Sequence, residues 1–226
     1  MKKLIIICSL TVLSHCLPAQ HKKHDANEYM HKNSTSSLIN AFNNPKRDRW
    51  QKPDLVIKKM GDLSNKTVMD LGAGPGYFTI KLAAHAQKVI AADPNQEFLD
   101  HIKKQLASED YRKYEDKVEL RKIPYDNARL APAEVDFILL INAYHHVKNR
   151  VEYFQNAKKG LKTDGKLMIV DYTMNTKHGP PKDHKLAASV AMNEIKKAGY
   201  SIVEYDTTTL PRQYIIMAAK RKVSQY

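Results

Sequence analysis

Cysteine is nearly absent from this sequence. Among the 226 residues there are two cysteines, Cys8 and Cys16, and both lie in the apolar segment at the start of the chain. If that segment is removed, the remainder has no thiol, which excludes a disulfide framework, a thiolate nucleophile and a cysteine metal site. An oxidising compartment is therefore permitted but not required.

Long hydrophobic runs are also missing. The longest, Leu4 to Leu17, follows two lysines and is shorter than the roughly 18 residues that a membrane span needs, but it suits the core of a signal peptide. We expect residues 1–19 to be a signal peptide cleaved after Ala19, or a membrane anchor. Lipidation at Cys16 is the third alternative, but the residues before Cys16 match the lipoprotein pattern poorly. A working leader predicts an exported protein, periplasmic or membrane-associated, and otherwise the protein is cytoplasmic.

Acidic residues are fewer than basic ones, 24 against 37, which gives a formal net charge of +13. A basic surface can attract nucleic acid or anionic lipid. The lysines are scattered along expected helices, as in KKQLASEDYRKYEDK, and this pattern indicates solvated faces. The acids do not cluster as in metal-dependent enzymes, so no metal site is expected.

Apolar runs typical of buried strands alternate with helical stretches. We expect an α/β domain over residues 50–226, preceded by a polar and partly helical extension over 20–49. Near-continuous apolar strands joined by helices indicate a parallel sheet covered on both faces. The last two strands are linked by TTTLP alone, too short for a parallel crossover, so the final strand should be antiparallel. The expected strands are 67–71, 88–93, 117–123, 135–142, 166–172, 200–206 and 213–221.

Three of the eight glycines lie together in DLGAGPG, as Gly72, Gly74 and Gly76. They follow the first strand and open the next helix, where backbone can approach a ligand closely. The spacing G-x-G-x-G differs from the G-x-G-x-x-G of dinucleotide sites, and Asp70 before it would repel a pyrophosphate. An acid there suits a cationic amine or sulfonium, and Asp93, ending the second strand, can accept hydrogen bonds from ribose hydroxyls. A nicotinamide-dependent oxidoreductase is therefore disfavoured.

The chain resembles the class I S-adenosylmethionine-dependent methyltransferases. The first two motifs of that family are similar to VMDLGAGPGYF and AADPNQEFLD, and later motifs are similar to PYDNARL, VDFILLINAYHHV and GLKTDGKLMIVDY. The resemblance covers residues from about 50 to 219. Thr163-Asp164 departs from the Pro-Gly usual before the fifth strand. The resemblance implies a Rossmann-like, doubly wound, seven-stranded sheet of order 3-2-1-4-5-7-6 with strand 7 antiparallel, and S-adenosylmethionine as cofactor.

The same resemblance implies a cofactor site made by the strand ends. It places Gly72, Ala73 and Gly74 against the methionine moiety and Asn142 toward the methyl-transfer region, with Asp70 supporting the loop or the amino group, Asp93 on the ribose and Asp126 on the adenine. Gly76, Tyr77 and Pro94 complete the implied set. Before the first strand, Trp50 and Gln51 would suit an N-terminal cover over the cofactor; a core position for Trp50 fits equally well.

The candidate catalytic residues lie just past Asn142, in AYHHV. A histidine with a pKa near neutrality could deprotonate an O–H or S–H acceptor, so Tyr144, His145 and His146 are the candidates. The alternative is that one histidine packs under the loop and the other is solvated.

The acceptor is the least specified part of this interpretation. The Asn-Pro-Pro-aromatic element of amino-methylating nucleic-acid enzymes is missing, which disfavours nucleic acid and favours a small-molecule acceptor. Thr163-Asp164 and the leader give modest support to the alternative of a non-catalytic cofactor-binding protein with the same fold. The sequence specifies neither the acceptor nor the oligomeric state.

Overall fold

The computed structural model describes residues 30 and 32–221. The expected signal peptide, its cleavage site and the lipidation alternative lie outside the described residues. Among the helices described, none combines the length and the apolar character that crossing a membrane requires.

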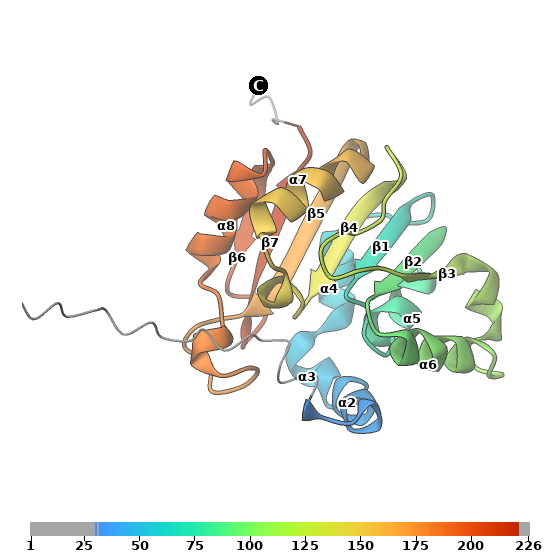
Figure 1. Ribbon diagram of the computed structural model, residues 1–226. Coiled ribbons are helices and arrows are strands. Elements are labelled where there is room, and N and C mark those ends of the chain that lie inside the picture. The colour runs from blue at the N-terminus through green and yellow to red at the C-terminus, as the bar shows by residue number, and fades with distance from the viewer. Residues whose placement is uncertain (1–29, 31, 222–226) are drawn as a thin grey trace, which may run out of the picture.

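A seven-stranded sheet forms the centre of the domain (Figure 1), in the order β3-β2-β1-β4-β5-β7-β6. Strands β1 to β5 are parallel, and β7 runs antiparallel to both β5 and β6. The expected order and the antiparallel last strand are confirmed. The strands are β1 (Thr67–Leu71), β2 (Lys88–Asp93), β3 (Val118–Lys122), β4 (Val135–Ile141), β5 (Leu161–Tyr172), β6 (Ser201–Asp206) and β7 (Gln213–Ala219).

Helices cover both faces of this sheet. Apolar side chains of α4 and α5 pack with one face of the central strands, α6 packs on β2 beside them, and α7 and α8 pack on the opposite face. Two short helices, α2 and α3, precede α4 at the sheet edge where the parallel strands end (Figure 1). The helices are α2 (Thr35–Phe42), α3 (Arg47–Gln51), α4 (Pro53–Lys59), α5 (Tyr77–Ala83), α6 (Gln96–Leu106), α7 (Arg150–Gly160) and α8 (Ala188–Lys197), with 3₁₀ turns η1 (Arg112–Lys117), η2 (Tyr144–His146) and η3 (Lys182–His184).

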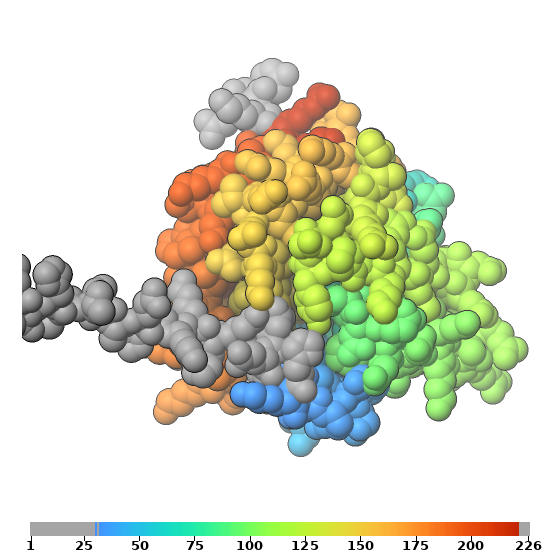
Figure 2. Space-filling model, in the orientation of Figure 1, coloured from blue at the N-terminus to red at the C-terminus, as the bar shows by residue number. Residues whose placement is uncertain are grey.

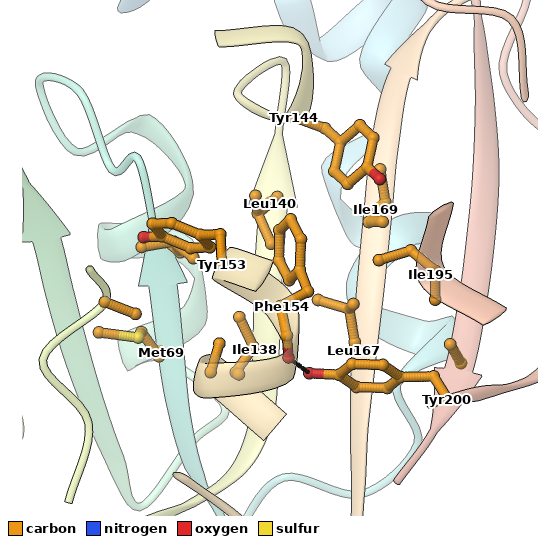
Figure 3. Packing of buried hydrophobic residues seen from close by; sticks show 14 of the residues in the cluster. Met69, Ile138, Leu140, Tyr144, Tyr153, Phe154, Leu167, Ile169, Ile195 and Tyr200 are labelled. Atoms are coloured by element: carbon orange, nitrogen blue, oxygen red, sulfur yellow. Dashed lines mark hydrogen bonds between the residues drawn. The ribbon is translucent and has the colours of Figure 1, made fainter. Parts of the chain in front are cut away.

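The core between the sheet and α7 is rich in aromatic rings (Figure 3). The ring of Phe154 lies 5.3 Å from Tyr144 and 5.2 Å from Tyr153, centroid to centroid, and all three are buried. Tyr200 donates a hydrogen bond from its hydroxyl to the Phe154 carbonyl oxygen, at 3.1 Å. Buried aromatic rings contribute large apolar areas, so this packing fixes the 3₁₀ turn η2 against the domain.

Strand β5 is longer than the sequence predicts, because it begins at Leu161 instead of residue 166. Leu161 pairs with Val135, and the register shifts before Phe137 pairs with Lys166, so residues 162–165 form a bulge. Thr163-Asp164, the departure from the family pattern, lies in this bulge at the amino end of the strand. Ligands in parallel sheets bind at the carboxyl ends, so the departure lies away from the site.

Candidate functional site

A cavity of about 1200 Å³ opens at the carboxyl ends of β1, β2, β4 and β5. Its walls include the N-terminal helices and the loop after β5, which lie near the same end of the parallel strands (Figure 1). In the space-filling view the blue helices and the orange loop both lie at the lower side of the molecule (Figure 2). Phe42 of α2 lies 6.2 Å from Phe98 of α6, ring to ring, so the extension packs on the domain beside the cavity. Pockets for one small ligand usually measure roughly 300–1000 Å³, which leaves room here for a cofactor and a second molecule.

The glycine loop forms the floor of the cavity. The amides of Gly72 and Ala73 donate hydrogen bonds to the Ala92 carbonyl oxygen, at 2.8 and 3.1 Å. Gly72 has φ +77°, and a Cβ there would lie 2.7 Å from the Ala143 Cβ. Only glycine suits this left-handed conformation and this close approach without displacement of the neighbouring backbone.

Two buried carboxylates flank the loop, as the sequence predicts. Asp70 accepts a hydrogen bond from the Thr79 hydroxyl at 2.7 Å. The two Asp93 oxygens accept from the amides of Gly74 and Asn95, each at 2.8 Å. Burial raises the pKa of each carboxyl to about 6, against the opposing effect of these hydrogen bonds. At neutral pH both are therefore anionic acceptors facing the cavity.

Arg47 is a cavity residue that the sequence does not single out, although its neighbours Trp50 and Gln51 are predicted to cover the cofactor. Its guanidinium lies 4.0 Å above the Tyr77 ring and donates to the Gln51 Oε1 atom at 2.8 Å and to the Phe42 carbonyl oxygen. Burial lowers the pKa of Arg47, and the Tyr77 hydroxyl and the Asp70 carboxylate oppose that shift. A fixed guanidinium at the glycine loop suits a carboxylate, such as that of a methionine moiety.

Gln51 does not line the cavity, so the predicted direct contact with the cofactor is not what the structure shows. Its side chain is fully buried, and its amide donates to the Gln213 Oε1 atom at 3.1 Å. Gln213 in turn donates to the Asn142 Oδ1 atom, at 2.5 Å. Asn142 lines the cavity and has φ +56°. Its place beside the methyl-transfer region stays a prediction. Gln51 therefore holds Arg47 directly and Asn142 through Gln213, from a position outside the cavity wall.

The three catalytic candidates separate in the structure. Tyr144 is wrong as a candidate: its ring packs on Phe154, and its hydroxyl donates to the Glu194 carboxylate at 2.9 Å, within the core. His145 and His146 both line the cavity, with ring centroids 4.2 Å apart. The direction in which a side chain leaves a 3₁₀ turn depends on tertiary packing, and here the Tyr144 ring packs into the aromatic core.

His145 is paired with a buried aspartate that the sequence analysis did not name. The His145 Nδ1 atom lies 2.9 Å from both oxygens of Asp171, and its backbone amide donates to the same carboxylate at 3.2 Å. The two side chains are 4% and 3% exposed. A carboxylate on Nδ1 keeps the proton on that nitrogen and leaves Nε2 as the basic atom. The sequence signal that indicates Asp171 is an acid close to the end of an expected strand, as at Asp70 and Asp93.

An aromatic stack forms part of the cavity wall near the end of β5. The Trp50 ring lies 6.1 Å from that of Tyr172, at an interplanar angle of 29°, and both line the cavity. On the loop after β5, a Cβ at Gly179 would come within 2.7 Å of the Tyr172 ring. The stack joins α3 to that loop, so of the two readings of Trp50, the cover over the cavity fits its position.

The remaining predicted residues divide between the wall and its surroundings. Ala73, Gly74, Tyr77 and Pro94 line the cavity. Gly76 and Asp126 do not: Gly76 packs beneath Ile102, and Asp126 lies on an exposed turn whose neighbour Tyr125 lines the cavity instead. Within residues 30 and 32–221, no three His, Cys, Asp or Glu side chains are grouped so as to hold a metal ion.

Comparisons with known proteins bear on this site. A family model described as a methyltransferase domain matches residues 69–169. The tRNA U34 carboxymethyltransferase of Haemophilus ducreyi is 26% identical over 184 residues, covering 73% of this chain and 54% of that protein. A SAM-dependent methyltransferase from Aquifex aeolicus has a TM-score of 0.76 at 21% identity, covering 84% and 100% of the two chains. The [4+2]-cyclase SpnF has a TM-score of 0.65 at 12% identity, covering 75% and 79%.

The sheet order, the glycine loop and these likenesses define the class I S-adenosylmethionine-dependent methyltransferase fold. Within that fold, residues 69–169 match the family model of a methyltransferase domain. The chain spans about half the length of the curated tRNA-modifying relative it matches.

The residues present fit S-adenosylmethionine. Asp93 offers acceptors for the ribose hydroxyls, Asp70 an anion near an ammonium group, and Arg47 a cation for the carboxylate. This arrangement requires glycine at position 72, because Ala143 already fills the space that a Cβ there would occupy. When bound, the cofactor supplies an electrophilic methyl group on a sulfonium.

The affinity for S-adenosylhomocysteine is expected to fall as the pH drops from about 7.5 to about 5. Asp70 and Asp93 have pKa values of about 6 and become protonated below it, losing their charge and part of their accepting capacity. If the ionised forms bind, each group lowers the affinity by about tenfold per pH unit below its pKa. Calorimetric titration across this range measures the effect, and a flat affinity would contradict it.

The unliganded fold should respond to pH in the opposite sense. Burial raises both pKa values above the ordinary 3.8, so the folded state binds more protons than the unfolded one between about pH 4 and 6. The contribution of these groups to the free energy of unfolding is therefore greatest below about pH 4 and declines as the pH rises through about 6. Urea denaturation without cofactor serves as the control.

Proposed function

We propose that this protein transfers a methyl group from S-adenosylmethionine to a small acceptor with an ionisable O–H, N–H or S–H group. The observation that carries the proposal is the buried His145–Asp171 pair, whose histidine lines the same cavity as the glycine loop. A pair of this kind serves general-base chemistry, which a merely cofactor-binding protein does not need.

The residues divide the work of the reaction between them. Asp93, Asp70 and Arg47 hold the cofactor, and Asn142 lies at the strand end where the acceptor approaches. The His145 Nε2 atom would take the proton from the acceptor while the acceptor's own lone pair receives the methyl group that the cofactor supplies, with S-adenosylhomocysteine as the leaving group. Asp171 keeps Nδ1 protonated and stabilises the imidazolium. Alignment of the two molecules in the cavity contributes about 7–11 kcal/mol to lowering the barrier.

A small acceptor is supported by the cover over the cavity. The Trp50–Tyr172 stack and the loop after β5 both contribute to the cavity wall, and an acceptor flanked by them on two sides is one that enters as a whole molecule. A second candidate is an RNA acceptor. The names of the curated relatives and the net charge of +13 favour it, against the sequence expectation that disfavours nucleic acid.

Methyl-labelled cofactor distinguishes these candidates. The full chain is incubated with it and with either total RNA or a small-molecule extract, and each pool is counted after separation. Label in the small-molecule pool that is lost with Asp171→Asn supports the proposal. Label in RNA shows the second candidate, and binding of S-adenosylhomocysteine without label in any pool points to a non-catalytic protein.

Export of the protein is a further part of the proposal and rests on the leader sequence. Sequencing the N-terminus of the native protein and fractionating cells test it. A chain that begins at residue 20 in the periplasmic or membrane fraction supports export, whereas a soluble cytoplasmic chain beginning at Met1 contradicts it.

A further inference from the structure

The loop after β5, residues 173–187, brings positive charge to the acceptor end of the cavity. Lys177, Lys182 and Lys185 line the cavity, whereas the single acid of the loop, Asp183, does not and is 66% exposed. The same wall carries His145 and His146 from η2, and these rings are uncharged or cationic.

The acids of the cavity wall lie elsewhere. Asp70 and Asp93 end β1 and β2, and Glu97 lies in the first turn of α6, all beside the cofactor loop. At the acceptor end, the Asp171 carboxylate is occupied by His145 and by the amide of Tyr172. The cavity is therefore polarised: three carboxylates outnumber the Arg47 guanidinium at the cofactor end, and ammonium groups line the other end. Such a field concentrates ligands of the opposite charge.

The loop is held in place by its own contacts. The Lys185 ammonium group donates to the Thr176 carbonyl oxygen and closes the loop across its width. Gly179 packs on the Tyr172 ring, and the turn η3 carries Lys182. These contacts keep Lys177 and Lys182 at the mouth of the cavity.

We infer that the methyl acceptor is an anion: a small molecule with a carboxylate or phosphate group that Lys177 and Lys182 bind at the cavity mouth. The ionisable proton of the acceptor then lies deeper in the cavity, toward His145. This inference rests on the proposed function and names the chemical class of its substrate. Carboxylate and phosphate share the recognising chemistry, charge-assisted hydrogen bonds from ammonium groups.

Fluorescence of Trp50 can test binding independently of turnover. Trp50 is the single tryptophan of the chain and lines the cavity, so its emission reports occupancy of the acceptor end. The full chain, saturated with S-adenosylhomocysteine, is titrated with hexanoate, hexyl phosphate or hexanamide, which differ in the charged group and do not absorb in the tryptophan range. We expect the anions to bind about tenfold more tightly than the amide, and the two anions to show which oxyanion is preferred.

The double variant Lys177→Gln/Lys182→Gln should weaken binding of the preferred anion by about tenfold, since each exposed lysine contributes modestly. Hexanamide and S-adenosylhomocysteine affinities should not change. The matched control is Lys196→Gln/Lys197→Gln, which removes the same charge from exposed positions on α8, away from the cavity.

Three results would overturn the inference. Hexanamide binds as tightly as the anions, the α8 control weakens anion binding as much as the loop variant does, or an oligoribonucleotide displaces the anions and becomes methylated in their place; any one of these findings rules the anionic small acceptor out. Failure to bind S-adenosylhomocysteine at all would instead count against the proposed function, so the two failures are distinguishable.

Discussion

Replacing His145 with alanine is expected to lower kcat by about 10²- to 10⁴-fold, the usual contribution of a general base. The affinity for S-adenosylhomocysteine should change by less than about threefold, because the residues proposed to hold the cofactor include Asp70 and Asp93 near the ends of β1 and β2 and do not include His145. Asp171→Asn should also lower kcat strongly, since an amide no longer fixes the proton on Nδ1. Steady-state kinetics with the acceptor found in the labelling experiment, beside calorimetric titration of S-adenosylhomocysteine, measures both quantities.

His146→Ala is the matched control for this prediction. His146 lines the same cavity, and its ring lies 4.2 Å from that of His145, but the Asp171 carboxylate is bonded to His145. We expect His146→Ala to lower kcat by less than about tenfold. The pH profile gives a readout that a structural role would not move: the acidic limb of kcat should disappear in His145→Ala and remain in His146→Ala. A His145→Ala variant with the wild-type rate and profile would exclude the base.

Gly72→Ala is expected to abolish useful cofactor binding. The added Cβ would lie 2.7 Å from the Ala143 Cβ, at a φ of +77° that alanine rarely adopts. Strain and overpacking together should cost about 2–4 kcal/mol of stability. Because the displaced loop also carries the amides beside Asp93, the affinity for S-adenosylhomocysteine should fall more than tenfold. Urea denaturation and calorimetric titration test the two effects separately.

Gly61→Ala separates strain from the close approach. Gly61 has a similar φ of +81°, but nothing lies within 4 Å of a Cβ there. It should lose only the strain energy, about 1–2 kcal/mol, and bind cofactor as the wild type does. Equal losses of cofactor affinity in the two variants would show that the contact with Ala143 does not matter.

Local patterns account for most of the fold. TVMDL and KVIAAD match β1 and β2 residue for residue, because a buried parallel strand needs an uninterrupted apolar run. The short TTTLP link predicts the antiparallel β7 for a steric reason that involves no distant residue. The bulge at the start of β5 was missed because the pairing of Leu161 with Val135 depends on tertiary contacts.

The site is only partly predictable for the same reason. Asp70, Gly72 and Asp93 are adjacent to strand ends, so their positions follow from the alternation of elements. Asp171 satisfies the same rule, yet its role depends on a contact with His145, 26 positions away. The direction of Tyr144 depends on the ring of Phe154, and no local pattern shows which of three neighbouring residues the core will take.

The buried bond between Gln51 and Gln213 joins residues 162 positions apart. It links α3, which carries the Arg47 guanidinium, to β7, which follows the other described strands in the chain. A chain still emerging from a ribosome without β7 lacks the partner that holds Gln51. The α3 side of the site therefore reaches its final packing only after β7 has been made, although its own residues are made early.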